Sequence, residues 1–306
     1  MKKLFKKREF KFDFLKRDKL FYGLSLMMLL VSVLSFAIRG MNYGIDFEGG
    51  VQIEASSSEP IDLKVVREEQ LNFLRGLTVQ STGEDGKHII IQAQPDPQQN
   101  SAQLLTKIKD ALGSTYSYQS VEIIGPSIGK ELKEKSLLAS VLALLAIAVY
   151  IWFRFEWPFA IGCLVALAHD LIIVVGVFSL FQIDFNMVVV AGLLALAGYD
   201  CNDSIVTYDR VRENLRKYRK LSVVDLLNRS INETLSRTML TSITTLFVVL
   251  VLLFVGGDAL FGFALAMCLG TILGTYSSIC IAVPLLKYFD IRKLGDTSDV
   301  APNFNA

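Results

Sequence analysis

The chain is poor in the residues that build metal sites and disulfide frameworks. Its 306 residues include only two histidines and four cysteines. No CxxC pair and no Cys/His spacing typical of zinc ligands occurs, so the sequence supports neither a disulfide framework nor bound zinc. We interpret the cysteines, which all fall in apolar stretches, as small buried residues: Cys163, Cys201, Cys268 and Cys280.

The sequence also lacks the motifs of nucleotide binding and nucleophilic catalysis. It has no Gly-rich phosphate loop, Walker motif or nucleophile–base arrangement, so energy from a nucleotide bound to this chain is not supported and we do not expect an enzyme. Basic residues at the N-terminus alternate with Phe5, Phe10, Phe12 and Phe14. Such a segment can be read as a nucleic-acid patch, but a lipid-surface anchor is the favoured interpretation, so we expect membrane lipids and no nucleic acid as partners.

Apolar residues are abundant, at 52% of the chain, and they gather in six long runs. A membrane helix needs about 20 mostly apolar residues, and six segments predict one each: residues 20–38, 136–153, 157–183, 185–208, 238–257 and 259–286. The first run could instead be the core of a signal peptide, but it exceeds the usual ~7–15 residues and no clear small-x-small cleavage site follows it. We therefore expect an uncleaved helix and an α-helical polytopic membrane protein.

Positive charge is segregated along the chain, and its distribution predicts the orientation. Lys and Arg crowd residues 1–19 and the segment 209–237, and they begin the tail at 287–306, whereas the links near Asp184 and Asp258 carry none. Cytoplasmic loops are enriched in Lys and Arg. Both termini and the 209–237 segment, which interrupts the five later helices at 136–286, are therefore expected in the cytoplasm.

Residues 39–135 form one polar insertion, which is expected on the other side of the membrane. Its patterns predict strands at 51–55, 77–81, 88–94 and 118–124, helices at 63–74 and 102–112, and loops at 83–86 and 95–99. The order β-α-β-β-α-β predicts an inserted α+β domain of the ferredoxin-like type. In front of it, Gly44, Asp46, Gly49 and Gly50 lie in a segment that is most simply read as a turn from helix to strand.

Three acidic residues inside the predicted membrane helices are the sharpest functional signal. A charge at the bilayer centre costs at least about 2.5–3.5 kcal/mol, so such residues usually face a bundle interior or water. Asp170 lies in the middle of the third run beside His169, and the two need not share a helix face. A structural pair that is bonded to neighbouring helices explains these two residues as well as a functional role does. Asp200 and Asp203 are three residues apart on one face of the fourth run, with Asn202 beside that face.

Two carboxylates this close in a low dielectric resist ionising together, which is the behaviour that a proton carrier needs. Arg237 opens the fifth run at nearly the same predicted depth as Asp203, ~27–30 Å from the outer side at 1.5 Å per residue. An arginine there can pair with the carboxylate and lose that partner when the carboxylate is protonated, which would switch the two helices between packings. A cytoplasmic anchor whose side chain snorkels to the surface explains Arg237 equally well.

Several short motifs occur in a fixed order on these elements. They are Gly44, Asp46, Gly49 and Gly50 after the first run; His169 and Asp170 in the third; Asn202 and Asp203 in the fourth; Asp209, Arg210 and Arg212 where it leaves the membrane; and Arg237 with hydroxyl residues at 241, 242, 244 and 245 in the fifth. Each motif is weak alone, and simple solvation is the favoured interpretation of the charged face at 209–213. As an ordered set, the motifs closely resemble the SecF branch of the SecD/SecF family.

The resemblance implies a fold of the resistance-nodulation-division type, in which six helices pair with a homologous six-helix SecD partner. It implies a bacterial inner-membrane subunit that uses the proton gradient, and no cofactor, to promote late-stage translocation of unfolded polypeptides from the SecYEG channel, with YajC as a further partner. The family's proton-relay residues correspond to Asp203 and Arg237. The family usually carries a small polar residue where this chain has Asp200, so Asp200 can share the proton or take over the role of Asp203.

Two other classes of protein remain open at this point. A half-size exporter of lipids or small molecules would carry similar helices, although such relatives usually have two large external domains in a twelve-helix chain. A passive assembly scaffold would leave Asp170, Asp200 and Asp203 with no role other than packing.

Overall fold

The structure is a computed structural model, and it describes residues 12–82, 86–95 and 101–292. Several segments of the chain lie outside the described residues: most of the basic N-terminal segment, most of the predicted loops at 83–86 and 95–99, and the tail beyond residue 292.

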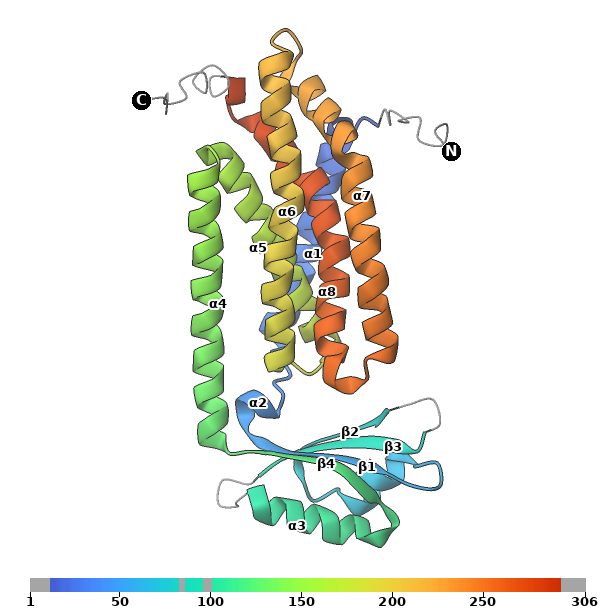
Figure 1. The fold of residues 1–306 in the computed structure, drawn as a ribbon. Coiled ribbons are helices and arrows are strands. Elements are labelled where there is room, and N and C mark those ends of the chain that lie inside the picture. Colours follow the sequence, from blue (N-terminus) through green and yellow to red (C-terminus); the bar gives the residue numbers. More distant parts are fainter. Residues whose placement is uncertain (1–11, 83–85, 96–100, 293–306) are drawn as a thin grey trace, which may run out of the picture.

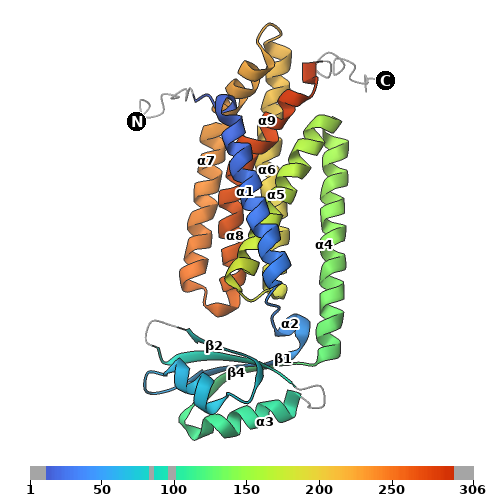
Figure 2. The ribbon, with the colours of Figure 1, turned by 180° about the vertical axis from the view of Figure 1, so that it is seen from behind.

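Six helices of the described chain are long and apolar enough to cross a membrane, as the sequence predicts. They are α1 (Asp18–Arg39), α4 (Pro126–Arg154), α5 (Trp157–Phe181), α6 (Met187–Lys217), α7 (Val223–Val255) and α8 (Asp258–Ser277). Lipid offers no hydrogen-bond partners, so each segment satisfies its backbone internally as a helix. Helices α1, α5, α6, α7 and α8 form a bundle, and α4 stands at its edge in both views (Figures 1 and 2).

Two of these helices begin well before the apolar runs. α4 begins at Pro126, where proline suits the first helical position because its missing N–H has no intrahelical acceptor there. α7 begins at Val223, because the Ser222 side chain accepts a hydrogen bond from the Asp225 N–H and caps the helix. The polar segment at 209–237 is therefore the end of α6, a short turn and the start of α7.

After α8 the helical path changes its winding. A π-helical turn, η4 (Ser278–Ala282), follows directly. It is followed by α9 (Val283–Leu285) and by a 3₁₀ turn, η5 (Leu286–Tyr288). Such π turns are rare and often lie at functional sites. The Tyr208 hydroxyl of α6 donates to the Ala282 carbonyl at 3.1 Å, so one of the carbonyls in this irregular turn is held by the neighbouring helix.

The inserted domain is a four-stranded antiparallel sheet with one covered face. Its strands are β1 (Gly50–Ser56), β2 (Arg75–Thr82), β3 (His88–Gln94) and β4 (Ser117–Ile124), in the order β2-β3-β1-β4. This is the ferredoxin-like arrangement that the sequence predicts. The helix α3 (Ser101–Leu112) and a π-helical segment, η2 (Val65–Gln70), complete the domain, and the helix predicted at 63–74 is correspondingly shorter.

The two faces of the sheet differ in polarity. Alternate residues of β1 behave differently: Val51 and Ile53 are fully buried in the core beneath α3, whereas Gln52 and Glu54 lie on the opposite face. That polar face is turned toward the ends of the membrane helices (Figure 1). A short helix, α2 (Ile45–Glu48), connects α1 to β1 at this junction.

The core of the inserted domain gives a direct test of this strand assignment. Ile53 pairs with Ile91 and is 0% exposed, so Ile53→Ala should lower the local unfolding free energy by about 2–5 kcal/mol. Hydrogen exchange of the β1 and β3 amides in the purified chain measures this loss. Ile123→Ala, at a site that is 45% exposed, is the matched control and should cost much less. Equal losses in the two variants would contradict the assigned faces.

Candidate functional site

The helices that carry the predicted acids pack closely inside the bundle. α6 lies along α8, and a Cβ placed on Gly192 would come within 3.2 Å of the Phe263 backbone. Small residues of this kind let membrane helices approach each other. Asp170, Asp200 and Asp203 are 0%, 2% and 3% exposed. All three side chains therefore point into protein rather than lipid.

Asp203 faces α7 through a chain of hydroxyl groups. The Ser242 hydroxyl lies 3.5 Å from Oδ2 of Asp203 as a donor, and the Thr275 hydroxyl of α8 donates to the Ser242 oxygen at 2.6 Å. Each hydroxyl both donates and accepts, so the chain can reverse its direction when Asp203 gains or loses a proton. The contacts of Asp203 thus join α6 to α7 and, through α7, to α8.

Arg237 lies on α7 at a depth similar to that of Asp203. At 1.5 Å per residue, Asp203 and Arg237 are roughly 24 and 27 Å from the ends of their helices that lie next to the sheet. The Arg237 side chain is exposed and makes no hydrogen bond or ion pair with any residue in the described ranges, although its charge acts on the Asp203 carboxyl group through space. The neighbouring helix therefore holds an unpaired cation at the level of a buried acid.

Asp170 is bonded both within α5 and to α8. The His169 ring nitrogen Nδ1 lies 2.7 Å from Oδ1 of Asp170, and the Ser277 hydroxyl donates to Oδ2 at 2.5 Å. The His169 side chain, which the sequence did not require to share a face with its neighbour, bends to meet it and is 4% exposed. Among the described residues, His169 Nε2 has no partner.

Asp200 lies against Asp170 rather than against α7. The two carboxyl groups are within hydrogen-bonding distance of each other. Oδ1 of Asp200 is buried and has no donor among the residues that the structure covers. It is directed at Gly274 of α8, where a Cβ would lie only 2.6 Å away. Asn202, between the two acids in sequence, is exposed on the other side of α6.

The charged motif near the end of α6 that points away from the sheet bonds to three neighbouring segments. The ion pairs are Asp209 with Arg154 of α4 (3.2 Å), Arg210 with Glu233 of α7 (2.6 Å), and Arg212 with Glu156 of the α4–α5 turn (3.1 Å). The motif side chains keep 24–46% exposure, so each pair is worth only about 0–1 kcal/mol. The face predicted to be solvated is thus hydrated and also tied to its neighbours.

At the end of the bundle next to the sheet, the glycine-containing motif contacts the start of α6. The Gly44 N–H donates to the Phe185 carbonyl at 3.0 Å. Asp46 Oδ2 accepts from the backbone N–H of Met187, the first residue of α6, at 2.8 Å. A carboxylate at a helix N-terminus satisfies a free N–H and suits the helix dipole. The segment read from sequence as a simple turn is therefore a cap on the helix that carries Asp200 and Asp203.

Gly49 and Gly50 allow three segments to meet behind this cap. Gly49 has φ 78°, and a Cβ there would lie 2.8 Å from the backbone of Pro126, where α4 begins. A Cβ on Gly50, with φ 156°, would lie 2.7 Å from the Ala93 carbonyl oxygen of β3. Only glycine fits both the dihedral angles and the close approach. The paired glycines therefore fix α4 and the sheet against α2.

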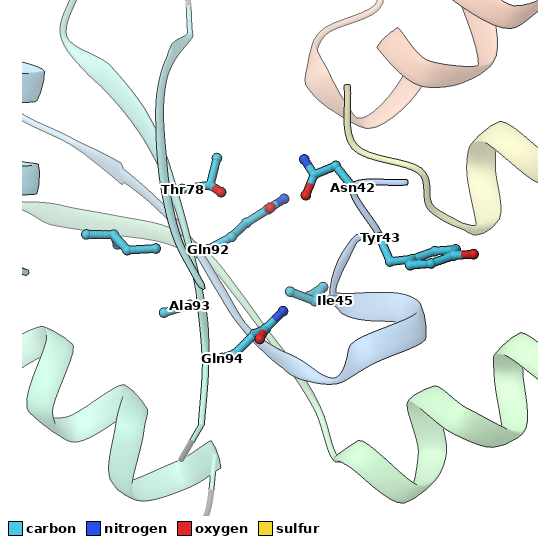
Figure 3. Close-up of a pocket in the computed structure, with 8 residues that line it drawn as sticks. Asn42, Tyr43, Ile45, Thr78, Gln92, Ala93 and Gln94 are labelled. Carbon is cyan, nitrogen blue, oxygen red and sulfur yellow. The ribbon is translucent and has the colours of Figure 1, made fainter. Parts of the chain in front are cut away.

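The α5–α6 turn also contacts the sheet of the inserted domain. Asn42 Nδ2 donates to the Asp184 carboxylate at 2.6 Å. Figure 3 shows the Gln92 side chain of β3 reaching toward Asn42 across a cavity of about 170 Å³. Burial raises the pKa of the Asp184 carboxyl group, and hydrogen bonds from Gln92 and Asn42 lower it by less. Sheet, linker and the turn between α5 and α6 thus meet at one half-buried acid.

Several of these residues escaped prediction from sequence. Thr275 and Ser277 look like ordinary small residues of an apolar run, and Asp184 and Asn42 look like loop residues. A usable signal was present in the sixth run, because Thr271 and Thr275 are four residues apart and share a helix face with their hydroxyls. Nothing in the sequence indicates that Asp200 contacts Asp170.

Comparisons with known proteins place this geometry in one family. The profile described as protein export membrane protein SecD/SecF, C-terminal, matches residues 104–292, and that of the SecD/SecF GG motif matches residues 34–61. The chain is 41% identical over 286 residues to the protein translocase subunit SecF of Rickettsia rickettsii, covering 92% of this chain and 93% of that protein. Its counterpart in Rickettsia bellii is 38% identical, with 92% of this chain and 94% of that protein covered.

Solved structures agree with these matches. The crystal structure of SecDF, a translocon-associated membrane protein from Thermus thermophilus, superposes with a TM-score of 0.81 and 33% identity over 91% of this chain and 38% of that chain. SecDF in a super-membrane-facing form gives a TM-score of 0.68 and 33% identity over 95% of this chain and 40% of that one. The chain therefore spans about two fifths of SecDF.

The raised pKa of Asp184 predicts a pH-dependent junction. Because the folded-state pKa exceeds the unfolded value of about 3.9, the stability that protonated Asp184 contributes is complete below that value and is lost as pH rises through the raised pKa. Asp184→Asn should abolish this loss, which thermal unfolding of the purified chain across acidic pH measures. Asp62→Asn, at an exposed acid of the inserted domain, is the control and should retain this loss. Identical pH profiles for wild type and Asp184→Asn would refute the role of this carboxyl group.

Proposed function

The chain belongs to the SecD/SecF family of protein export membrane proteins, and we propose that it is the SecF-type subunit of a protein translocase that couples proton movement to export. The observation that carries the proposal is the burial of Asp203 within α6. Its carboxyl group is bonded to the Ser242 hydroxyl of α7, at a depth similar to that of the exposed Arg237 on the same helix.

Protonation of Asp203 would alter how α6 and α7 pack. An ionised carboxylate is acceptor-only and attracts the Arg237 guanidinium, whereas a protonated carboxyl group can donate and no longer holds that cation. Two packings of the helix pair would then differ by one proton, and a proton gradient would bias their populations. The Asp46 cap and the Asn42–Asp184 contact link the same helix to the external domain, which gives the switch a mechanical output.

The proposed assembly follows from what this chain exposes and from its length. A SecD-type partner with six further helices would supply the part of SecDF that this chain does not span. Arg237 and Asn202 are exposed at mid-bundle depth on α7 and α6, where such a partner would shield them from lipid. Translocating polypeptide from SecYEG would then meet the external domain, and YajC is a further expected partner.

The proposed orientation places both termini in the cytoplasm of a bacterial cell, with the chain in the inner membrane. The positively charged cytoplasmic ends of α6 and α7 support it. The external domain then acts on polypeptides after they leave the channel, and the proton gradient supplies the energy without a cofactor bound to this chain. Family membership over nearly the full length of the SecF relatives weighs against a half-size exporter of lipids.

Replacement of Asp203 tests the proposal. Asp203→Asn keeps the shape and a hydrogen-bonding group but cannot bind and release a proton near neutral pH. In proteoliposomes containing SecYEG, its ATPase motor and the SecD-type partner, gradient-dependent stimulation of export should fall to the level of vesicles without this chain. Asp225→Asn, at an exposed acid near the start of α7, is the matched control and should keep full stimulation.

Co-purification with the SecD-type partner separates loss of coupling from loss of assembly. Asp203→Asn should co-purify as the wild type does. Full gradient-dependent stimulation by an assembled Asp203→Asn complex would exclude Asp203 as the coupling residue. Failure of both variants to assemble with the partner would point to a scaffold role for this helix.

A further inference from the structure

A second cluster of polar groups lies deeper in the bundle, apart from the contacts of Asp203. Asp170 of α5 and Asp200 of α6 meet where both helices pack against α8. Ser277 of α8 donates to Asp170, while Asp203 is bonded to Ser242 of α7. The two acids three residues apart on α6 therefore serve different interfaces, and the carboxyl group of Asp200 has its closest acidic partner on α5.

The hydrogen bonds of this cluster leave one place without a donor. The two oxygens of Asp170 are engaged by His169 and by Ser277, at 2.7 and 2.5 Å. Oδ1 of Asp200 has no donor within the described ranges, and Asp200 is 2% exposed. Ionised carboxylates only accept hydrogen bonds, so two of them in contact need a hydrogen between them. Two adjacent buried negative charges are also mutually destabilising.

No side chain with a permanent positive charge compensates the pair. Neither carboxyl group makes an ion pair with a Lys or Arg in the part of the chain that the structure describes. His169 can donate from Nδ1 while Nε2 stays a bare acceptor, but a charged ring would bury a second N–H with no acceptor. A neutral His169 therefore leaves the negative charge of the pair to be offset by a proton.

The other titratable groups around the pair are weak acids. They are Cys163 on α5, Cys201, Asp203 and Tyr208 on α6, Tyr276 on α8, Cys280 on η4, and Tyr22 on α1, with Arg237 on α7 acting on Asp203. Arg237 acts on Asp203 and not on the pair, so no side chain with a permanent positive charge competes with the proton of the pair.

We propose that Asp170 and Asp200 form a second proton-binding site, a carboxyl–carboxylate pair that holds one shared proton between α5, α6 and α8. Its use in export rests on the proposed function above, whereas its occupancy by a proton does not. A metal cation is a poorer occupant, because both Asp170 oxygens already have donors and two carboxyl groups supply fewer oxygens than the roughly six to eight that Ca²⁺ takes. No cluster of metal-ligating side chains occurs among the described residues.

The surroundings of the site are suited to release of the proton that Asp170 and Asp200 share. Ser277 is the last residue of α8 before the π-helical turn η4, and Tyr208 of α6 holds the end of that turn. Gly274 leaves room beside Oδ1 of Asp200. Thr275, two residues from Ser277, belongs to the hydroxyl chain that reaches Asp203. A shift of α8 would therefore disturb both acid sites together.

Infrared spectroscopy of the purified chain reads the shared proton directly. With aspartate labelled by ¹³C at the side-chain carboxyl carbon, the wild type at neutral pH should show the carbonyl stretch of a protonated carboxyl group. The corresponding band should be lost in both Asp170→Asn and Asp200→Asn, since either change removes one half of the pair. Asp203→Asn should retain it. The asparagine amide can donate to the remaining carboxylate, so both variants are expected to fold.

The outcomes separate this proposal from the proposed function. Retention of the band in Asp200→Asn would show that Asp170 binds a proton without Asp200. Absence of the band from the wild type would show that no proton is bound. Either result would refute the proposed shared proton. The wild-type measurement stands even if a variant fails to fold. Loss of the band on exchanging potassium for sodium would instead indicate a bound cation and would also overturn it. Normal export by Asp203→Asn would refute the proposed coupling and leave this result untouched.

Discussion

The organisation of this bundle depends on the cost of burying carboxyl groups between closely packed helices. Three acids lie almost fully inside the protein, and none makes an ion pair with Lys or Arg among the described residues. Hydroxyl groups of α7 and α8 satisfy Asp203 and Asp170 instead. Neutral donors stabilise a negative charge less than a cation does, so protonation of these acids costs the fold little. A set of buried acids held in this way can exchange protons without dismantling the helices.

Hydrogen bonds near the α5–α6 turn connect the bundle to the inserted domain. Asp46 caps α6, Gly44 bonds to the α5–α6 turn, and Asn42 bonds to Asp184 of the same turn. These contacts all converge on the helix pair that carries the buried acids. The paired glycines bring the sheet and the start of α4 to the same place. These contacts would therefore transmit a change in the packing of α6 to the polar face of the sheet.

Much of this architecture was accessible from sequence because it follows from periodicity and hydropathy. Six apolar runs predicted six helices, and alternating residues such as Val51 and Ile53 predicted the sheet. Helix ends were less predictable, since α4 and α7 extend into polar segments where propensity and capping by Ser222 decide. Side-chain pairing across helices was not predictable, because rotation about each helix axis is set by packing. Asp200 therefore paired with Asp170, from a different run, rather than with Asp203 on its own face.

The central claim is that the ionisation of Asp203 changes the packing of α6 against α7. Spin labels on cysteines introduced at exposed Arg216 of α6 and Val224 of α7, with the native cysteines replaced, report the separation of these helices by pulsed electron resonance. In the complex with the SecD-type partner, the wild type should show two distance populations whose ratio changes with pH, whereas Asp203→Asn should show one population at every pH. A distribution that ignores pH in the wild type, or that still responds to pH in Asp203→Asn, would contradict the account.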